Sequence, residues 1–189
     1  GDTSSALELY NLASAAASVV IKFYDSETGT EIPAAEIMDS IVALGRKTYF
    51  TAQNPGLPSP FVGSVLVTSD QDVKGTLCTY RGRKFGCIEV SNRGSYAVCL
   101  PQILRQSDGL NSWFAVQNVG SNPVTVRVRF KRGAAGKDYE TPPVTIQPGA
   151  AKLYDQETEP NLGPTFVGSA LVIREGSAPI MAIAFVESE

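Results

Sequence analysis

A seven-residue stretch that occurs twice decides the fold: Phe61-Val62-Gly63-Ser64-Val65-Leu66-Val67 and Phe166-Val167-Gly168-Ser169-Ala170-Leu171-Val172. Six of the seven positions are identical. Upstream, residues 7–24 align without a gap with residues 114–131, so that Asn11 matches Asn118. A third block aligns Gly45 and Tyr49-Phe50 with Gly149 and Leu153-Tyr154. Three blocks in the same order predict the tandem duplication of one structural module.

The periodicity of both copies is that of β-strands. Residues 18–24 are rich in β-branched and aromatic side chains, and residues 124–130 alternate strictly between apolar and polar ones, as expected for antiparallel strands with one face on a core. Turn residues recur at short intervals, so we predict two tandem antiparallel β-sandwiches, Ig-like or jelly-roll-like. They span residues 1–81 and 100–189, joined by a connecting β-hairpin at residues 82–99. The predicted buried side chains are Ile21, Phe23, Leu66, Val126, Val128, Phe130 and Leu171, with Val65 and Ala170 facing the opposite way.

Two stretches interrupt this pattern. Residues 32–44 contain a possible helical turn after Pro33, and the matching residues 139–147 contain Pro142-Pro143. Since proline is excluded from a helix interior, we expect both stretches to be irregular connections.

Composition excludes several classes of function. Of the 189 residues, 43% are hydrophobic and 19% are charged, and the net charge of −3 offers no basic excess for binding nucleic acid. No apolar run approaches the roughly 18 residues that span a bilayer. Histidine is absent, which removes the commonest general base and metal ligand, and no catalytic or phosphate-binding motif occurs. We therefore expect neither an enzyme nor a cofactor or metal site.

The three cysteines are the sharpest local signal. A two-residue turn at Gly82 pairs Cys78 with Cys87, and a three-residue turn at residues 92–94 pairs Cys87 with Cys99. All three would then lie abreast on neighbouring strands, within disulfide range. One disulfide is expected, either Cys78–Cys87 or Cys87–Cys99, and the stronger Asn-Arg-Gly turn favours the second.

Weaker signals are assigned structural roles. Asn11 and Asn118 end strands, where a short amide bonds local backbone, and Gly63 and Gly168 indicate a close backbone approach. Calcium sites at two acidic loops and a glycan-binding aromatic platform are less favoured than solvated loops and packed rings. The residues concerned are Asp25, Glu27, Glu31, Asp155, Glu157 and Glu159 for calcium, and Trp113, Tyr139 and Tyr154 for the platform.

Several motifs in the second half resemble a family of repeated modules. They are Leu100-Pro101-x-x-x-Arg105, Asp108-Gly109, Trp113 to Asn118, Pro148-Gly149, Phe166 to Ser169, and Thr79-Tyr80-Arg81-Gly82. Together they are similar to β-sandwich repeats of secreted and cell-surface proteins from filamentous, often thermophilic bacteria. The resemblance covers most of residues 79–189 and, more weakly, residues 6–78. It implies an extracellular architectural role and no active site.

The two copies differ at their edges. Residues 96–106 form a strand-like leader before the second repeat, and the first repeat has no counterpart. An incomplete sandwich exposes unpaired backbone, which a neighbouring subunit can pair by strand addition. The sequence therefore predicts a secreted homopolymer, a filament or surface layer. The alternatives are a carbohydrate-binding or adhesive module of a larger surface protein and, more weakly, a capsid protein.

The candidate donors are residues 1–9 and 84–99. The candidate assembly residues are Gly1, Asp2, Thr3, Leu7, Leu9, Phe85, Ile88, Val90, Leu100, Ile103 and Leu104.

Overall fold

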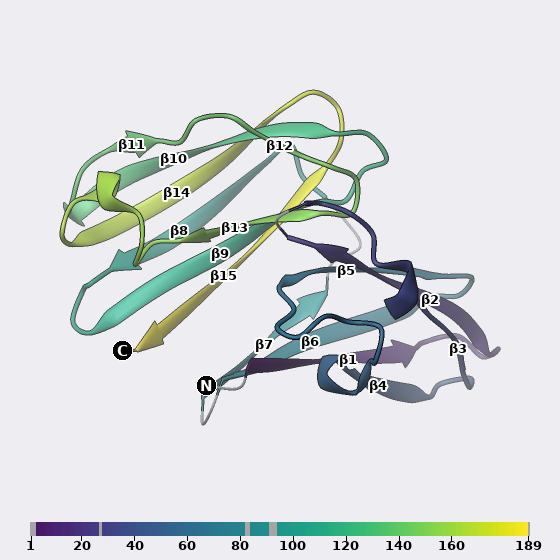
Figure 1. Cartoon of the computed structure of the whole chain (residues 1–189). Coiled ribbons are helices and arrows are strands. Elements are labelled where there is room, and N and C mark those ends of the chain that lie inside the picture. The colour runs from purple at the N-terminus through teal and green to yellow at the C-terminus, as the bar shows by residue number, and fades with distance from the viewer. Residues whose placement is uncertain (1–2, 27, 82–83, 91–93, 189) are drawn as a thin grey trace. The chain divides into compact units, whose positions relative to one another are not determined.

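In a computed structural model the chain is all-β, with antiparallel sheets and only three short 3-10 helices among the described residues (Figure 1). The structure describes residues 3–26, 28–81, 84–90 and 94–188. The chain divides into unit 1, residues 1–25 and 30–92, and unit 2, residues 26–29 and 93–189. The predicted separate connecting hairpin at 82–99 is therefore divided between the units, because its first strand pairs within unit 1 and its last residues begin a strand of unit 2.

Unit 1 contains two sheets. Its strands are β1 (Thr3–Asn11), β2 (Ala17–Asp25), β3 (Ile37–Ile41), β4 (Arg46–Phe50), β5 (Gly63–Ser69), β6 (Val73–Arg81) and β7 (Lys84–Val90). One sheet has the order β4-β1-β6-β7 and the other the order β3-β2-β5. The 3-10 helices η1 (Pro33–Ala35) and η2 (Thr51–Gln53) lie in the connections.

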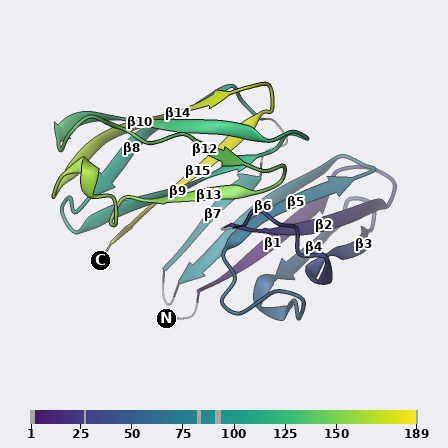
Figure 2. The same cartoon turned by 45° about the horizontal axis from the view of Figure 1, so that its top comes forward.

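Unit 2 repeats this plan, and its two sheets form two layers (Figure 2). Its strands are β8 (Ala97–Arg105), β9 (Leu110–Asn118), β10 (Val124–Ala135), β11 (Tyr139–Glu140), β12 (Val144–Ile146), β13 (Ala151–Asp155), β14 (Phe166–Glu175) and β15 (Ile180–Ser188), with η3 (Pro160–Leu162) before β14. One sheet has the order β11-β10-β14-β8, with β12 also on β10, and the other β13-β9-β15. Strands β1 to β6 therefore correspond to β9, β10, β12, β13, β14 and β15.

The duplication is visible in matching hydrogen bonds. Asn11 Nδ2 donates to the carbonyls of Ala15 and Ile41, and Asn118 Nδ2 donates to those of Asn122 and Ile146. Each side-chain oxygen accepts from the backbone N–H two residues later. Both asparagines are buried, so the predicted structural role is confirmed.

The predicted glycine role is also confirmed. A Cβ at Gly63 would lie 2.1 Å from the carbonyl oxygen of Tyr24, and one at Gly168 would lie 2.2 Å from that of Lys131. In each unit the preceding phenylalanine ring, Phe61 or Phe166, also contacts this site. Only glycine fits there, because the backbones approach too closely for any side chain.

The alternating strands form the cores as predicted. Ile21 and Phe23 of β2 are buried, as are Val126, Val128 and Phe130 of β10. The phase of β5 and β14 was predicted wrongly: Leu171 is 38% exposed, whereas Ala170 is 1% exposed. Leu66 shares the outward position of Leu171, and Val65 packs on the core of unit 1.

Two further expectations are corrected. Residues 32–44 and 139–147 are not irregular throughout, because they contain β3 and β12, each paired to the central strand of its sheet. The third sequence block is shifted by one residue: Tyr49 pairs with Leu7 as Tyr154 pairs with Phe114, so Tyr49 corresponds to Tyr154 and not to Leu153.

Candidate assembly site at the edge of unit 1

The two copies of the repeated stretch lie on strands with different neighbours. Strand β14 pairs with β10 on one side and with β8 on the other, whereas β5, among the described residues, pairs only with β2. The strand of residues 97–105 thus has no counterpart beside β5 in the described part of the chain, as expected, but unit 1 is not simply one strand short, because its β7 has no counterpart in unit 2. No described strand pairs with the edge of β5 that faces away from β2, although Ser64 and Val65 of β5 have further interactions.

The side chains beneath this edge are less covered than their counterparts. Ala170 and Val172 are 1% and 0% exposed in the sheet that contains β8. The corresponding Val65 and Val67 are only half-buried. Ile88 and Val90 of β7, in the other sheet of unit 1, are half-buried as well. Unit 1 thus has an apolar edge where unit 2 has a covering strand.

The backbone groups of Val67 in β5 point away from β2. Ile32 N–H donates to the carbonyl of Phe23, so the odd-numbered residues of β2 there direct their backbone groups away from β5. Backbone groups in an antiparallel pair alternate between the two sides. Val67, which lies opposite Ile21 of β2, therefore directs its N–H and C=O toward the edge of β5 that has no described neighbouring strand.

Strand β5 also lacks the residues that usually protect an edge. Its sequence, GSVLVTS, contains neither a charge nor a proline, although natural sheets commonly place charges or proline on exposed edges. The edge strands β3, β4 and β13 do carry charges, at Asp39, Arg46, Lys47, Lys152 and Asp155. The sequence of β5 is therefore mainly apolar and contains none of these protecting residues.

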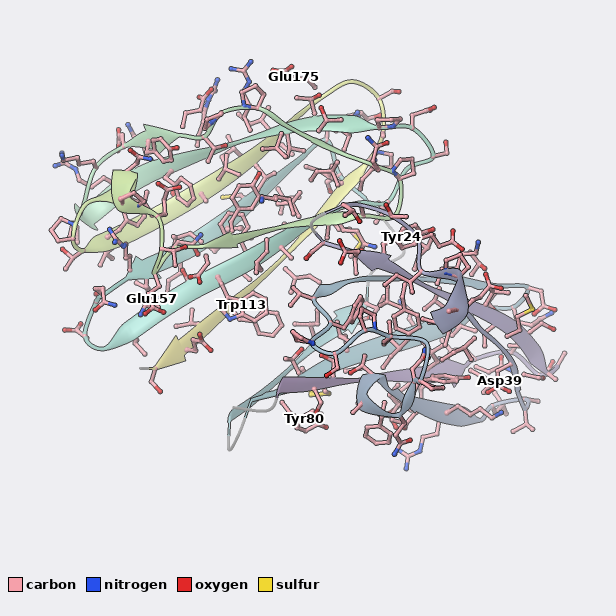
Figure 3. The ribbon with its side chains drawn as sticks, in the orientation of Figure 1. Tyr24, Asp39, Tyr80, Trp113, Glu157 and Glu175 are labelled. Atoms are coloured by element: carbon pink, nitrogen blue, oxygen red, sulfur yellow. A yellow bond between two sulfur atoms is a disulfide. The ribbon has the colours of Figure 1, made fainter. Side chains whose placement is uncertain are left out.

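Asp39 illustrates the contrast at the other edge of the same sheet (Figure 3). Lys47 Nζ lies 2.7 Å from Asp39 Oδ1, and the hydroxyl of Tyr49 donates to Asp39 Oδ2 at 3.1 Å. The hydrogen bond from Lys47 holds the pKa of the Asp39 carboxyl below its usual value. Polar interactions therefore occupy the β3 edge of this sheet. Strand β5, at the other edge, has no charged side chain that could form such interactions.

Most predicted assembly residues have structural roles inside the units. Leu7 and Leu9 are core residues of β1, and Leu100, Ile103 and Leu104 are buried in β8. The predicted arm of residues 1–9 is therefore not a free donor, because Thr3 onward is β1, paired with both β4 and β6. Residues 84–90, including Phe85, form β7 on β6; Gly1 and Asp2 lie outside the described residues.

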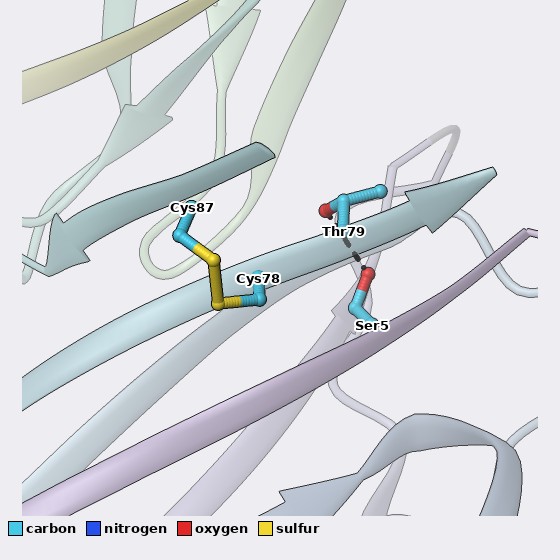
Figure 4. Close-up of a disulfide and its surroundings, with 4 residues drawn as sticks. All are labelled: Ser5, Cys78, Thr79 and Cys87. Atoms are coloured by element: carbon cyan, nitrogen blue, oxygen red, sulfur yellow. Dashed lines mark hydrogen bonds between the residues drawn. A yellow bond between two sulfur atoms is a disulfide. The ribbon is translucent and has the colours of Figure 1, made fainter. Parts of the chain in front are cut away.

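The disulfide joins Cys78 to Cys87 across β6 and β7, beside the hydrogen bond between Ser5 and Thr79 (Figure 4). The first predicted hairpin register is confirmed, since Arg81 pairs with Lys84. The preference for Cys87–Cys99 is wrong, as is the arrangement of three neighbouring strands. Cys99 lies opposite Leu171 of β14 with a free, exposed thiol.

The aromatic candidates are packed against separate rings. Trp113 stacks on Phe185 with ring centroids 4.3 Å apart, Tyr139 stacks on Phe130, and Tyr154 stacks on Phe114. The predicted packing of these rings is thus confirmed.

The acidic candidates have local partners. Glu31 pairs with Lys22 at 2.9 Å, Asp155 Oδ1 accepts from the N–H of Glu157, and Glu159 accepts from that of Asn161; Glu27 lies outside the described residues. Within the described ranges, no group of three or more acidic or cysteine side chains is placed to hold a metal ion.

In the part of the chain that the structure describes, no helix has both the length and the apolar character needed to cross a membrane. Comparison of the chain with protein-family models, with curated proteins and with solved structures found no match.

Proposed function

We propose that this chain is a secreted structural subunit that assembles with copies of itself into an extracellular filament or surface layer. In this proposal each unit is an Ig-like or jelly-roll-like β-sandwich, and the sandwich of unit 1 is completed by a strand of another copy. The observation that carries the proposal is that β8 has no counterpart beside β5 among the described residues, so that Val67 is half-buried while the corresponding Val172 is covered.

The energetics favour covering this edge. Each net backbone hydrogen bond contributes about 0.5–1.5 kcal/mol, and complete burial of a valine side chain contributes roughly 1.5–3 kcal/mol relative to full exposure. The outward backbone groups of Val67 and its remaining exposed area would both contribute to an association, which must offset lost freedom of motion.

Two further features support an extracellular location. The Cys78–Cys87 disulfide is of the kind that persists in oxidising compartments. The low charge content, 19% of residues, leaves neutral surface for contacts between subunits. Both agree with the resemblance to cell-surface repeat modules.

The test is the oligomeric state of the purified chain over a wide concentration range. We expect fibres or sheets in negative-stain micrographs and a mass far above the 20.1 kDa of one chain. A protein that stays monomeric at high concentration would contradict the proposal, and retention by an immobilised glycan would then favour a binding module.

A further inference from the structure

Two neighbouring connections of unit 1 expose large apolar side chains. Residues 12–16, with the sequence LASAA, connect β1 to β2, and residues 42–44, with the sequence VAL, lie between β3 and β4. In these two segments Leu12 is 49% exposed, Val42 is 71% exposed and Leu44 is 77% exposed. The two segments together are called the apolar tip.

Backbone hydrogen bonds hold the apolar tip in place. The N–H of Leu44 donates to the carbonyl of Ala13, which joins the two segments to each other. The N–H of Leu12 donates to the carbonyl of Asp72, in the connection between β5 and β6. The tip is therefore a fixed part of unit 1, although its large side chains are exposed to solvent.

Unit 2 has a different residue at the position of Leu44. Each unit closes this turn with a hydrogen bond from its last N–H to its first carbonyl, over residues 42–45 in unit 1 and residues 147–150 in unit 2. Leu44 therefore corresponds to Gly149, and both have a positive φ, of 55° and 79°. This backbone conformation suits glycine and strains a leucine. Unit 1 thus keeps a leucine where unit 2 has the residue that the turn favours.

The contacts of Leu44 within the chain do not account for this strain, because most of its side chain is exposed. Strained residues are commonly kept where a function uses them. Val42 likewise stands where unit 2 has the polar Gln147. We propose that the apolar tip inserts into the surface of a lipid bilayer, with its side chains at the boundary between headgroups and hydrocarbon. This inference goes beyond the proposed self-assembly and does not depend on it.

The size of the tip favours a lipid surface over a second copy of the chain. A stable interface between proteins buries about 800 Å² on each partner, from roughly 20–30 residues. The tip offers only three large apolar side chains, those of Leu12, Val42 and Leu44. It is therefore too small to hold a protein partner by itself. A bilayer needs no matching surface, because the strength of insertion scales with the apolar area that is buried.

The charges around the tip favour a bilayer without net charge. Neither segment of the tip contains a charged residue. Asp70 and Asp72 lie in the adjoining connection between β5 and β6, and Asp70 accepts a hydrogen bond from the N–H of Ser18 at 2.7 Å. Arg46 begins β4 just after the tip and pairs with Glu8 at 3.0 Å. Groups of both signs thus border the tip, as suits zwitterionic headgroups, and no basic cluster is there to attract an anionic surface.

The test measures flotation of the full-length chain with phosphatidylcholine vesicles. Leu44→Gly gives unit 1 the residue that unit 2 has, so it removes an inserting side chain and also relieves the strained turn. Val42→Gln does the same for the second position. The matched control is Met38→Ser, because Met38 is 76% exposed but lies on β3, outside the tip.

We expect the unmodified chain to float with the vesicles at both low and high salt, because the tip carries no charge to be screened. Leu44→Gly should lower the partition coefficient about tenfold, and the double variant with Val42→Gln roughly a hundredfold, since each removes apolar area that insertion would bury. Met38→Ser should leave it unchanged. Thermal unfolding checks the fold of Leu44→Gly, which should be no less stable than the unmodified chain because glycine tolerates a positive φ. Leu44→Asn replaces it if it does not fold.

Four outcomes would overturn the insertion. They are an unmodified chain that does not float, a Leu44→Gly variant that floats equally well, an equal loss in Met38→Ser, and flotation only with anionic vesicles that disappears at high salt. Loss of self-association in Leu44→Gly, with no flotation of the unmodified chain, would show that the tip contacts another copy instead. A chain that floats as expected but never assembles would support the insertion and remove only the proposed function.

Discussion

Val67 and Val172 occupy equivalent positions in the two units, yet Val172 is 0% exposed and Val67 is only half-buried. Both lie on the inward face of a strand paired to the central strand of its sheet. The difference follows from β8, which pairs Val98 with Val172 and has no described counterpart on β5. Equivalent valines are thus a fully buried core residue in one unit and a half-buried residue in the other.

We expect Val172 to contribute more than Val67 to the free energy of unfolding of the monomer. Val172→Ala should cost about 2 kcal/mol, because it removes fully buried methyl groups and leaves a cavity. Val67→Ala should cost less than half as much, since solvent already reaches the site. Urea unfolding at low protein concentration measures both, and equal losses would show that the edge of β5 is covered in the monomer.

The buried asparagines should be essential to each unit. Asn118→Ala leaves the carbonyls of Asn122 and Ile146 and the N–H of Gly120 without this partner, which should cost roughly 2–4 kcal/mol. Asn11→Ala should have a similar effect in unit 1. Thermal unfolding checks this, with the exposed Asn161→Ala as control. If Asn118→Ala or Asn11→Ala lost less stability than the Asn161→Ala control, the structural role given to these amides would be contradicted.

Local sequence patterns correctly predicted those features of the fold that neighbouring residues determine. Strict alternation over residues 124–130 identified β10 and its inward face, because only one face of that strand is apolar. The run Val65-Leu66-Val67 is apolar on both faces, so the sequence does not show which of its side chains face the core. The prediction that Leu66 is a core residue was therefore wrong. The close approach at Gly63 was readable because a glycine inside a strand pattern commonly marks a bulge or a neighbouring backbone.

The sequence patterns could not predict which distant segments pair with each other. The turn near Gly82 places Cys78 opposite Cys87, since a short hairpin fixes its own register. Strand β8 instead pairs with β14, about 70 residues later in the chain, and no turn signal specifies such a contact. That β8 has no described counterpart beside β5 was inferable only by comparing the two repeats. The sequence did not indicate that β7 and β8 extend non-equivalent sheets of their units.

The disulfide gives a direct chemical prediction. Alkylation of the folded, unreduced protein should label Cys99 alone, because its thiol is exposed while Cys78 and Cys87 are bonded. The double variant Cys78→Ser/Cys87→Ser should lose about 2–3 kcal/mol, the amount expected for a short closed loop. Cys99→Ser is the matched control and should leave stability nearly unchanged. Mass spectrometry that finds label on Cys78 or Cys87 would refute the assigned pairing.

Tyr49 and Tyr154 are equivalent tyrosines with opposite hydrogen-bond states. The hydroxyl of Tyr49 donates to Asp39 at 3.1 Å, whereas the buried hydroxyl of Tyr154 has no hydrogen-bond partner among the described residues. Tyr154→Phe should therefore raise the free energy of unfolding by about 1 kcal/mol at neutral pH, because an unsatisfied polar group is removed. Tyr49→Phe should lower it by a similar amount, since the Asp39 carboxylate loses a donor. Urea unfolding of both variants measures the two changes, and a loss of stability in Tyr154→Phe would contradict the assigned state of its hydroxyl.

The pH dependence of the same pair gives an independent measurement. Burial raises the pKa of Tyr154 to about 12 from its ordinary value of 10.0. Between these values the unfolded chain releases the phenolic proton and the folded chain keeps it, so stability falls as pH rises from 10 toward 12. Tyr154→Phe removes this contribution, and the variant should lose less stability than the unmodified protein between pH 9 and about 11. Urea unfolding at the two pH values tests the prediction, and equal losses would mean that the hydroxyl of Tyr154 is solvated in the folded protein.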